Sequence, residues 1–424
     1  FWISAYTIHF GLVVYSLVCM IGFMTGLEIP LIMRINQTYE SLRENISSVM
    51  EYDYYGGLLG GALFAFVLLP FLGLTYTPVL IGSLNLLVAS LVLWHFSNHL
   101  VRPRILNIQF TALLIISVLA FSVAKPIVLY GEQHKYKDKI IYQEQTRYQK
   151  IVVTQWKDNF WLFINGSTQF STYDEERYHE PLVHPVMSLL KEHKDILLLG
   201  AGDGLAAREI LKYSDVESLT LVDLDPAMTR LARQHKMFLE INQGSLNDTR
   251  VRVINKDAYQ FMKESPDLYD AIIIDLPDPK SVSLSLLYSL GFYKMVEKHL
   301  KPFGAMVTQS TSPLYSPEAF LCIKKTMQAA NFSTLPYQNS VPSMGQWGWV
   351  LGIRKKTMPA NRLKQEIIAQ KLSDIETRFF NQNAMISMAN FGKGLFEKED
   401  KIEPNTQFNH NILKYYRQGS WDLY

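Results

Sequence analysis

The stretch Asp195-Ile-Leu-Leu-Leu-Gly200-Ala-Gly202-Asp203-Gly204 decides the fold. Four consecutive apolar residues predict a buried strand, and Leu205 to Tyr213 follows the glycines as a predicted helix. A glycine turn between a strand and a helix is typical of a nucleotide site, because it lets the backbone approach a ligand. The alternative is a turn in which the glycines only pack the helix against the sheet.

The same alternation of strand and helix continues after this stretch. The predicted strands are 218–222, 251–254, 271–274 and 305–308, and the predicted helices are 226–240 and 286–300. This order is typical of a doubly wound, mostly parallel sheet. We therefore predict an α/β Rossmann-like domain of the S-adenosylmethionine-dependent methyltransferase type. Short β-rich runs around Asn165-Gly166, a hairpin signal, predict a small N-terminal β subdomain.

The first part of the chain is different. Over the whole chain only 19% of the residues are charged, and the charge is lowest in this first part. No Asp, Glu, Lys or Arg occurs in Phe1–Leu27, Tyr54–Val101 or Ile105–Ala124. A helix of about 20 residues crosses a bilayer, so these runs predict an N-terminal α-helical transmembrane bundle. A buried helical core is a poorer interpretation, because the runs have almost no polar face.

Four membrane spans are predicted, with a turn at Gly73, Thr75, Thr77 and Pro78 between the second and the third. The spans are 6–33, 56–74, 78–96 and 105–124. Because the chain opens on Phe1 within an apolar run, we expect a fragment that further spans precede. The predicted domains are 1–130, transmembrane; 131–180, β-rich; 181–357, Rossmann-like; and 358–424, a partly helical tail.

Composition excludes several classes of protein. A net charge of +2 with interleaved signs provides no basic tract for nucleic acid. Cys19 and Cys322 alone cannot form a disulfide scaffold or a cysteine-rich zinc site. His95 and His99 lack a third ligand. We expect no metal.

Aspartates follow the predicted strands, at the edge where parallel sheets bind ligands. They are Asp203, Asp223, Asp257, Asp275 and Asp278. Clustered carboxylates repel a pyrophosphate and attract cations, which disfavours NAD or FAD and favours an adenosyl sulfonium with an amine substrate. A solvated acidic rim is the alternative.

Several motifs occur in the order seen in polyamine aminopropyltransferases. They are Tyr148-Gln149, 174–180 (DEERYHE), 200–204 (GAGDG), 222–225 (VDLD), Asp257-Ala258, 275–279 (DLPDP) and 341–348 (VPSMGQWG). The chain resembles the membrane-attached bacterial branch of the spermidine synthase family. The resemblance implies transfer of the aminopropyl group of decarboxylated S-adenosylmethionine, a co-substrate, to an amine such as putrescine, giving spermidine and 5'-methylthioadenosine.

The resemblance also implies roles for single residues. The nucleoside-binding residues are Gln149, Gly200, Gly202, Asp223, Asp257 and Ala258. His179, Asp203 and Asp278 are implied to bind the amine. Asp275 is implied to be the catalytic proton acceptor, since an ammonium must lose its proton before it attacks.

Further implications concern partners and location. They are a small polyamine substrate, a lipid bilayer, a homodimer or homotetramer, and a multi-pass location in the bacterial inner membrane. Arg and Lys residues in the loops give a weak preference for a cytoplasmic catalytic domain.

The chain departs from the family pattern at four places. Asp223 replaces the common Glu, Ala258 replaces Gly, Lys280-Ser281-Val282 replaces a Gly-Pro segment, and Met344 stands where a Tyr is often found. These departures leave the identity of the acceptor amine open.

Two other functions remain open at this stage. One is methyl transfer from S-adenosylmethionine on the same fold. The other is a non-catalytic polyamine sensor or transporter, which Glu28 in an apolar span motivates. The cluster 415–421 at the end of the tail docks either on the catalytic domain or on a membrane surface.

Overall fold

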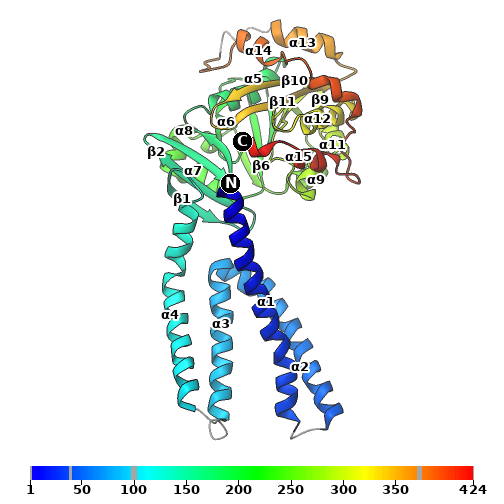
Figure 1. The fold of residues 1–424 in the computed structure, drawn as a ribbon. Coiled ribbons are helices and arrows are strands. Elements are labelled where there is room, and N and C mark those ends of the chain that lie inside the picture. The colour runs from blue at the N-terminus through cyan, green and yellow to red at the C-terminus, as the bar shows by residue number, and fades with distance from the viewer. Residues whose placement is uncertain (1, 38–40, 97–102, 370–374, 424) are drawn as a thin grey trace. The chain divides into compact units, whose positions relative to one another are not determined.

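The computed structural model describes residues 2–37, 41–96, 103–369 and 375–423 (Figure 1). The chain divides into two compact units, a helical unit of residues 1–135 and a catalytic unit of residues 136–424. Phe1 and His99, which the sequence analysis considers, lie outside the described residues.

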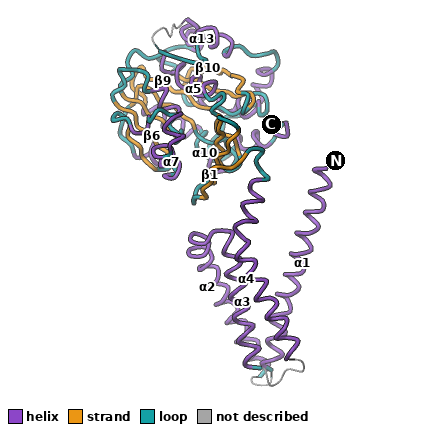
Figure 2. The backbone as a smooth tube through the Cα atoms, turned by 90° about the vertical axis from the view of Figure 1, so that its left-hand side faces the viewer, coloured by secondary structure: helices purple, strands orange, loops and turns teal. Residues whose placement is uncertain are grey.

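Long apolar helices form the helical unit (Figure 2). They are α1 (Trp2–Asn36), α2 (Leu42–Leu63), the π-helical turn η1 (Phe64–Leu68), α3 (Leu69–His95) and α4 (Pro103–Gln133). Four segments within them are long and apolar enough to cross a membrane, judged by length and composition alone: 11–36, 42–73, 76–95 and 104–123. The predicted apolar helices are therefore present, whereas their attachment to a membrane is not shown.

The predicted turn near residue 73 is confirmed. Gly73 has φ 64° and ψ −174°, which breaks the helical geometry inside α3. Thr77 is buried, and its Oγ1 donates to the carbonyls of Gly73 (2.6 Å) and Leu68 (3.2 Å). This hydroxyl compensates carbonyl groups that the break leaves without helical partners.

The second helix begins at Leu42, well before the predicted start at residue 56. Charged residues end an apolar run but do not end a helix, because Arg and Glu are good helix formers. The buried Asn45 joins this helix to the first, since its Nδ2 donates to the Met33 carbonyl at 2.7 Å.

The catalytic unit begins with a four-stranded antiparallel sheet in the order β1-β2-β3-β4. Its strands are β1 (Lys139–Gln145), β2 (Lys150–Trp156), β3 (Asn159–Ile164) and β4 (Ser167–Ser171). The predicted hairpin is confirmed, because Asn165 (φ 51°) and Gly166 (φ 81°) form the turn between β3 and β4. Positive φ at both positions is what a two-residue hairpin turn requires.

A seven-stranded sheet follows, in the order β10-β11-β9-β8-β5-β6-β7. Its strands are β5 (Asp195–Gly200), β6 (Ser218–Asp223), β7 (Val251–Asn255), β8 (Tyr269–Asp275), β9 (Leu300–Gln309), β10 (Phe332–Val341) and β11 (Gly345–Arg354). Five neighbouring strands of this sheet, β7, β6, β5, β8 and β9, pair in parallel. β11 and β10 then add an antiparallel edge beside β9. This is the mostly parallel α/β sheet that the strand–helix alternation predicts.

Helices cover both faces of this sheet. They are α5 (Glu176–Ser188), α6 (Leu205–Ile210), α7 (Pro226–Gln234), α8 (Lys236–Ile241), α9 (Ala258–Glu264), α10 (Val282–Leu286), α11 (Leu290–His299), α12 (Pro317–Ala329), α13 (Ala360–Ala369), α14 (Gln382–Met388) and α15 (Asn411–Arg417). Short 3-10 turns lie at η3 (Ser245–Asn247), η4 (Leu395–Lys401) and η5 (Trp421–Leu423).

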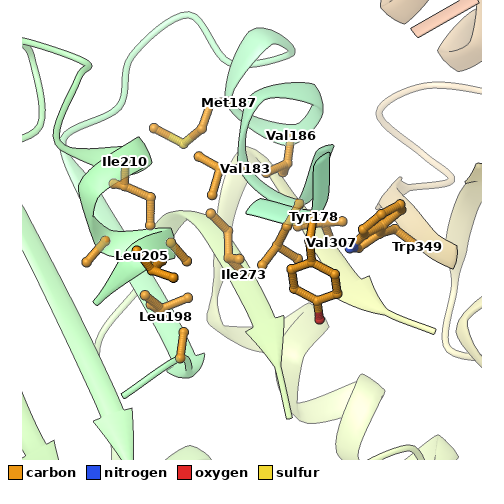
Figure 3. Close-up of a cluster of buried hydrophobic side chains, with 14 of the residues drawn as sticks. Tyr178, Val183, Val186, Met187, Leu198, Leu205, Ile210, Ile273, Val307 and Trp349 are labelled. Carbon is orange, nitrogen blue, oxygen red and sulfur yellow. The ribbon is translucent and has the colours of Figure 1, made fainter. Parts of the chain in front are cut away.

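Two apolar cores result, because neighbouring residues of a strand point to opposite faces. On β5, Leu198 belongs to one core, whereas Leu197 and Leu199 belong to the other. Figure 3 shows the first core, where Val183 of α5 lies over Leu198. A sheet buried on both faces is rigid, and its strand ends can hold side chains in fixed positions.

Candidate active site

The carboxyl ends of β5, β6 and β8 meet at one edge of the large sheet. β5 ends at Gly200, which pairs in register with Asp275, the last residue of β8. β6 ends at Asp223. Asp203 and Asp278 lie in the loops that follow β5 and β8, and Asp257 directly precedes α9. The edge predicted from the sequence therefore exists in the fold.

The turn after β5 requires glycine at two positions, because neighbouring atoms leave no room for a Cβ atom there. A Cβ on Gly200, which has φ +83°, would lie 2.0 Å from the Asp275 carbonyl oxygen. A Cβ on Gly202 would lie 2.5 Å from Asp223 Oδ2, which accepts a hydrogen bond from the Gly202 amide at 3.1 Å. Both glycines thus bring the turn close to the acidic strand ends, beyond any role in packing the helix.

Asp223 is held by two backbone amides. Its Oδ2 accepts from Gly202, and its Oδ1 accepts from the Asp225 amide at 2.9 Å. Burial raises the pKa of Asp223 to about 6, and the nearby Asp203 adds to the rise, while the two amides oppose it. The carboxylate is oriented, as a residue that accepts bonds from ribose hydroxyls must be.

Gln149 reaches this edge through the small sheet. Its backbone lies in the turn between β1 and β2, where its carbonyl accepts from Thr146 Oγ1 at 3.0 Å. The same hydroxyl is 2.8 Å from Asp225 Oδ2, which ties the turn to the residues after β6. Gln149 and Asp223, far apart in sequence, are thereby brought to the same region.

Asp257 has a different setting. Its Oδ1 accepts from the Gln260 amide at 2.9 Å, so it caps the N-terminus of α9. Ala258 is the first residue of that helix and is buried. The Asp257-Ala258 pair follows β7 in the chain, and β7 is the neighbour of β6 in the sheet.

Asp275 is bound by a tyrosine. The hydroxyl of Tyr178 on α5 donates to Asp275 Oδ1 at 2.6 Å. Burial raises the pKa of Asp275 to about 6; His179 and the Tyr178 hydrogen bond oppose the rise, and Asp203 adds to it. A carboxylate with this pKa is a base of moderate strength that is ionised at neutral pH.

His179 is buried beside Asp275 and Asp203. Its Nδ1 lies 2.9 Å from the Glu175 carbonyl and 3.0 Å from Glu175 Oε2. Burial favours the neutral ring, but Glu175 outweighs it and the pKa of His179 is raised. The raised pKa reflects the carboxylates of Glu175, Asp203 and Asp275 around the ring, and the predicted contact of His179 with the amine stays a prediction.

The Glu175 carboxylate is itself fixed by arginines. Arg208 Nη2 lies 2.9 Å from Glu175 Oε1, and Arg378 of the tail pairs with the same oxygen. Burial would raise the pKa of Glu175, but hydrogen bonding to His179 and the charges of His179 and both arginines lower it to about 2. Glu175 is therefore an anion at every pH at which the fold is expected to work.

Asp278 accepts bonds from two neutral donors. Tyr416 donates to Oδ2 at 2.9 Å, and Gln309 Nε2 lies 3.4 Å from Oδ1. Burial raises the pKa of Asp278, whereas Lys280 and these hydrogen bonds lower it. Lys280 itself donates to Ser167 Oγ at 2.6 Å, so the loop that departs from the family pattern contacts the small sheet.

Sequence reasoning assigned no role to Tyr178 or Tyr416. Tyr178 lies inside the quoted run 174–180, which was the available signal, whereas Tyr416 is 138 residues from its partner Asp278. Trp349 of β11 is fully buried between Tyr178 and Tyr337 at ring distances of 5.4 and 5.6 Å, which fits core packing (Figure 3). Within the described ranges no three His, Cys, Asp or Glu residues are grouped as metal ligands.

Comparisons with known proteins match most of the chain. Residues 175–365 match the model of the spermine/spermidine synthase domain. The polyamine aminopropyltransferase of Oceanobacillus iheyensis is 40% identical over 94% of this chain and 76% of its own. That of Leptospira interrogans is 37% identical over 96% of this chain and 80% of its own.

Solved structures share the fold of the catalytic unit. A spermidine synthase crystallised with the transition-state analogue AdoDATO matches with a TM-score of 0.55 and 24% identity, over 62% of this chain and 89% of that one. The spermidine synthase of Thermotoga maritima matches with a TM-score of 0.54 over 88% of its chain.

The comparisons contradict the location expected from the sequence. A multi-pass location in the bacterial inner membrane is wrong, because the matched domain and the matched solved structures are those of spermidine synthases, and the match to the solved structures covers 62% of this chain. The apolar helices satisfy length and composition criteria only.

Proposed function

Because the chain belongs to the spermine/spermidine synthase family and is a polyamine aminopropyltransferase, we propose that it moves the aminopropyl group of decarboxylated S-adenosylmethionine to putrescine. The products are spermidine and 5'-methylthioadenosine. The observation that carries this proposal is the half-buried Asp275, hydrogen-bonded to the buried Tyr178 at the end of β8.

Electrostatics at the strand ends select the substrates. Asp203 raises the pKa of both Asp223 and Asp275, and all three aspartates are half-buried, where charges act more strongly than in water. The sulfonium donor and a diamine are both cations, so this edge attracts both and repels anionic nucleotides. Glu175 lies 3.0 Å from His179 Nδ1 and holds the imidazole ring beside the aspartates.

The reaction is a single displacement. The amine nitrogen attacks the propyl carbon attached to the sulfonium sulfur, forming the N–C bond as the C–S bond breaks. The sulfur keeps the electron pair and leaves as a neutral thioether, and Asp275 takes the proton that the attacking nitrogen loses. Since the sulfonium is a good leaving group, alignment of nitrogen, carbon and sulfur supplies much of the acceleration.

The nucleoside is held on the other side of the glycine turn. Asp223 accepts bonds from the ribose hydroxyls, Gly200 and Gly202 allow close approach, and Gln149 with the Asp257-Ala258 pair borders the nucleoside. Asp203 and Asp278 face the amine groups. No metal enters this scheme.

An assay that offers each donor in turn tests the proposal. Putrescine with decarboxylated S-adenosylmethionine should give methylthioadenosine and spermidine in equal amounts, measured by mass spectrometry. S-adenosylhomocysteine formed from S-adenosylmethionine would instead indicate a methyltransferase. Binding of polyamine without either product would indicate a sensor or transporter and would contradict the proposal.

The surroundings and assembly of the chain stay predictions. Side chains such as Phe66 and Phe71 are 78% and 81% exposed in the helical unit, and this much apolar surface is costly in water. We infer that this apolar surface is covered when the chain is functional; sedimentation with and without detergent tests this, and a dispersed full chain without detergent would contradict it. Light scattering of the detergent-bound protein tests the predicted homodimer or homotetramer.

A further inference from the structure

The C-terminal tail returns to the acidic edge of the sheet. After β11 the chain runs through α13, α14 and η4, and α15 packs against α12 (Figure 1). From α15, the Tyr416 hydroxyl donates to Asp278 Oδ2 at 2.9 Å. A residue of the tail helix α15 thus contacts a carboxylate of the candidate active site.

Tyr416 is held in place by its neighbours. Its side chain is buried, and its ring lies 4.6 Å from that of Trp421. The Trp421 Nε1 donates to the Tyr416 carbonyl at 2.8 Å, which closes the tail on itself. A hydroxyl on a ring that is already fixed loses little entropy when it binds.

The start of α15 is anchored as firmly. Asn405 is fully buried; its Nδ2 donates to the Ser285 carbonyl at 2.8 Å, and its Oδ1 accepts from the Ile412 amide at 3.3 Å. Ser285 belongs to α10, the helix that follows the Asp278 loop. The same polar contacts therefore fix the tail helix and the segment that carries Asp278.

The hydrogen bonds from Tyr416 and Gln309 suit a carboxylate at Asp278 that must stay charged. Tyr416 and Gln309 are neutral donors, so they orient the Asp278 carboxylate and leave its charge for a cation. The described structure aligns one lone pair of each Asp278 oxygen in this way. Thr311 and the charge of Lys280 also act on this carboxylate, and an ammonium group would join these partners.

We propose that Tyr416 is a positioning residue that orients Asp278 to hold the non-reacting ammonium of the diamine acceptor. The C-terminal helix α15 then forms part of the amine subsite and makes the enzyme prefer a diamine to a monoamine. The inference rests on the proposed function, since it assumes that Asp278 faces the amine.

The test compares Tyr416→Phe with Tyr415→Phe, a matched control on the same helix. The Tyr415 hydroxyl accepts a hydrogen bond from the Glu403 amide at 3.3 Å. This contact is exposed and does not involve Asp278. Two acceptors are used, putrescine and butylamine, which share a four-carbon chain and differ by the second ammonium. The full chain is assayed in detergent.

Tyr416→Phe should raise the KM for putrescine about tenfold, the size expected for a lost bond to a charged group. The KM for decarboxylated S-adenosylmethionine, the kcat with putrescine, and the kcat/KM with butylamine should change less than about twofold. Tyr415→Phe should behave as wild type. Equal losses for both amines, or none, would overturn the inference and leave the proposed function standing.

A second measurement does not need turnover. Putrescine should raise the Tm of the wild-type chain without any donor, and Tyr416→Phe should require about tenfold more putrescine for the same rise. A chain that forms no methylthioadenosine but shows this difference would sink the proposed function and support the role of Tyr416. An identical Tm response in both chains would overturn that role.

Discussion

The Tyr178 hydroxyl on α5 donates a 2.6 Å hydrogen bond to Oδ1 of Asp275, the last residue of β8. The Tyr178 ring is buried and lies 5.4 Å from that of Trp349 in the apolar core (Figure 3). The core of the fold thereby sets the position of the candidate base. Four predictions follow from this relationship and from the glycine turn beside it, and a fifth measurement tests the base itself.

The rate of the wild-type enzyme should depend on pH on the acid side. Asp275 and Asp223 both have a pKa of about 6, and both must be ionised to act. The kcat/KM should therefore fall below about pH 6, with a slope that approaches two on logarithmic axes. Initial rates of methylthioadenosine formation between pH 5 and 8 check this, and a flat profile across that range would contradict it.

Tyr178→Phe should move the acid limb to higher pH. The tyrosine hydrogen bond lowers the pKa of Asp275, so its loss leaves the base protonated at pH values where wild type is active. Activity should fall more at pH 6 than at pH 8. The same pH series measures the change.

Tyr337→Phe is the control for this variant. Tyr337 also packs on Trp349, with its ring centroid 5.6 Å away, but its hydroxyl donates to the Pro181 carbonyl at 2.8 Å. This variant should lower the Tm and leave the acid limb in place. An equal shift of the limb in both variants would show that packing, and not the hydrogen bond, sets the pKa.

Asp275→Asn should stabilise the fold at high pH. The folded pKa of about 6 lies above the ordinary value of 3.8, so the folded chain binds the proton more tightly and loses stability as pH rises from about 4 to 6. The amide cannot ionise, so its gain should be present at pH 8, at most about 3 kcal/mol, and absent near pH 4. Thermal unfolding at both pH values checks the sign; a variant less stable than wild type at pH 8 would contradict it.

Gly202→Ala should impair binding of the donor. Its Cβ would lie 2.5 Å from Asp223 Oδ2, so the turn or the carboxylate must move. We expect the KM for decarboxylated S-adenosylmethionine to rise at least about tenfold, or about 1.4 kcal/mol. In Gly392→Ala, where a Cβ would meet no atom within 4 Å, the KM should not change; a similar rise there would refute the steric argument.

The sequence predicts the acidic edge well because its signal is local. Asp223 and Asp275 directly follow runs of apolar residues, and parallel strands place such ends together. Likewise the break at Gly73 follows from a glycine in an apolar run too long for one helix. These features need only the order of residues in one segment.

Contacts between distant segments could not be predicted in this way. Tyr178 lies 97 residues from Asp275 in the sequence, and only the packing of α5 shows that its hydroxyl reaches this carboxylate. Tyr416 approaches Asp278 because α15 packs on α12, and no period or spacing indicates that docking. The charge of His179 depends on Glu175, whose own charge depends on Arg208 and Arg378 from two other segments.

The most direct test of the central claim, that Asp275 is the proton acceptor, is the pH dependence of kcat/KM in Asp275→Asn. The account predicts a loss of about 10²–10⁴-fold at pH 7.5, with the slope of the acid limb reduced from about two towards one, since Asp223 alone remains to be ionised. Rates within a few-fold of wild type, with the acid limb unchanged, would contradict the account.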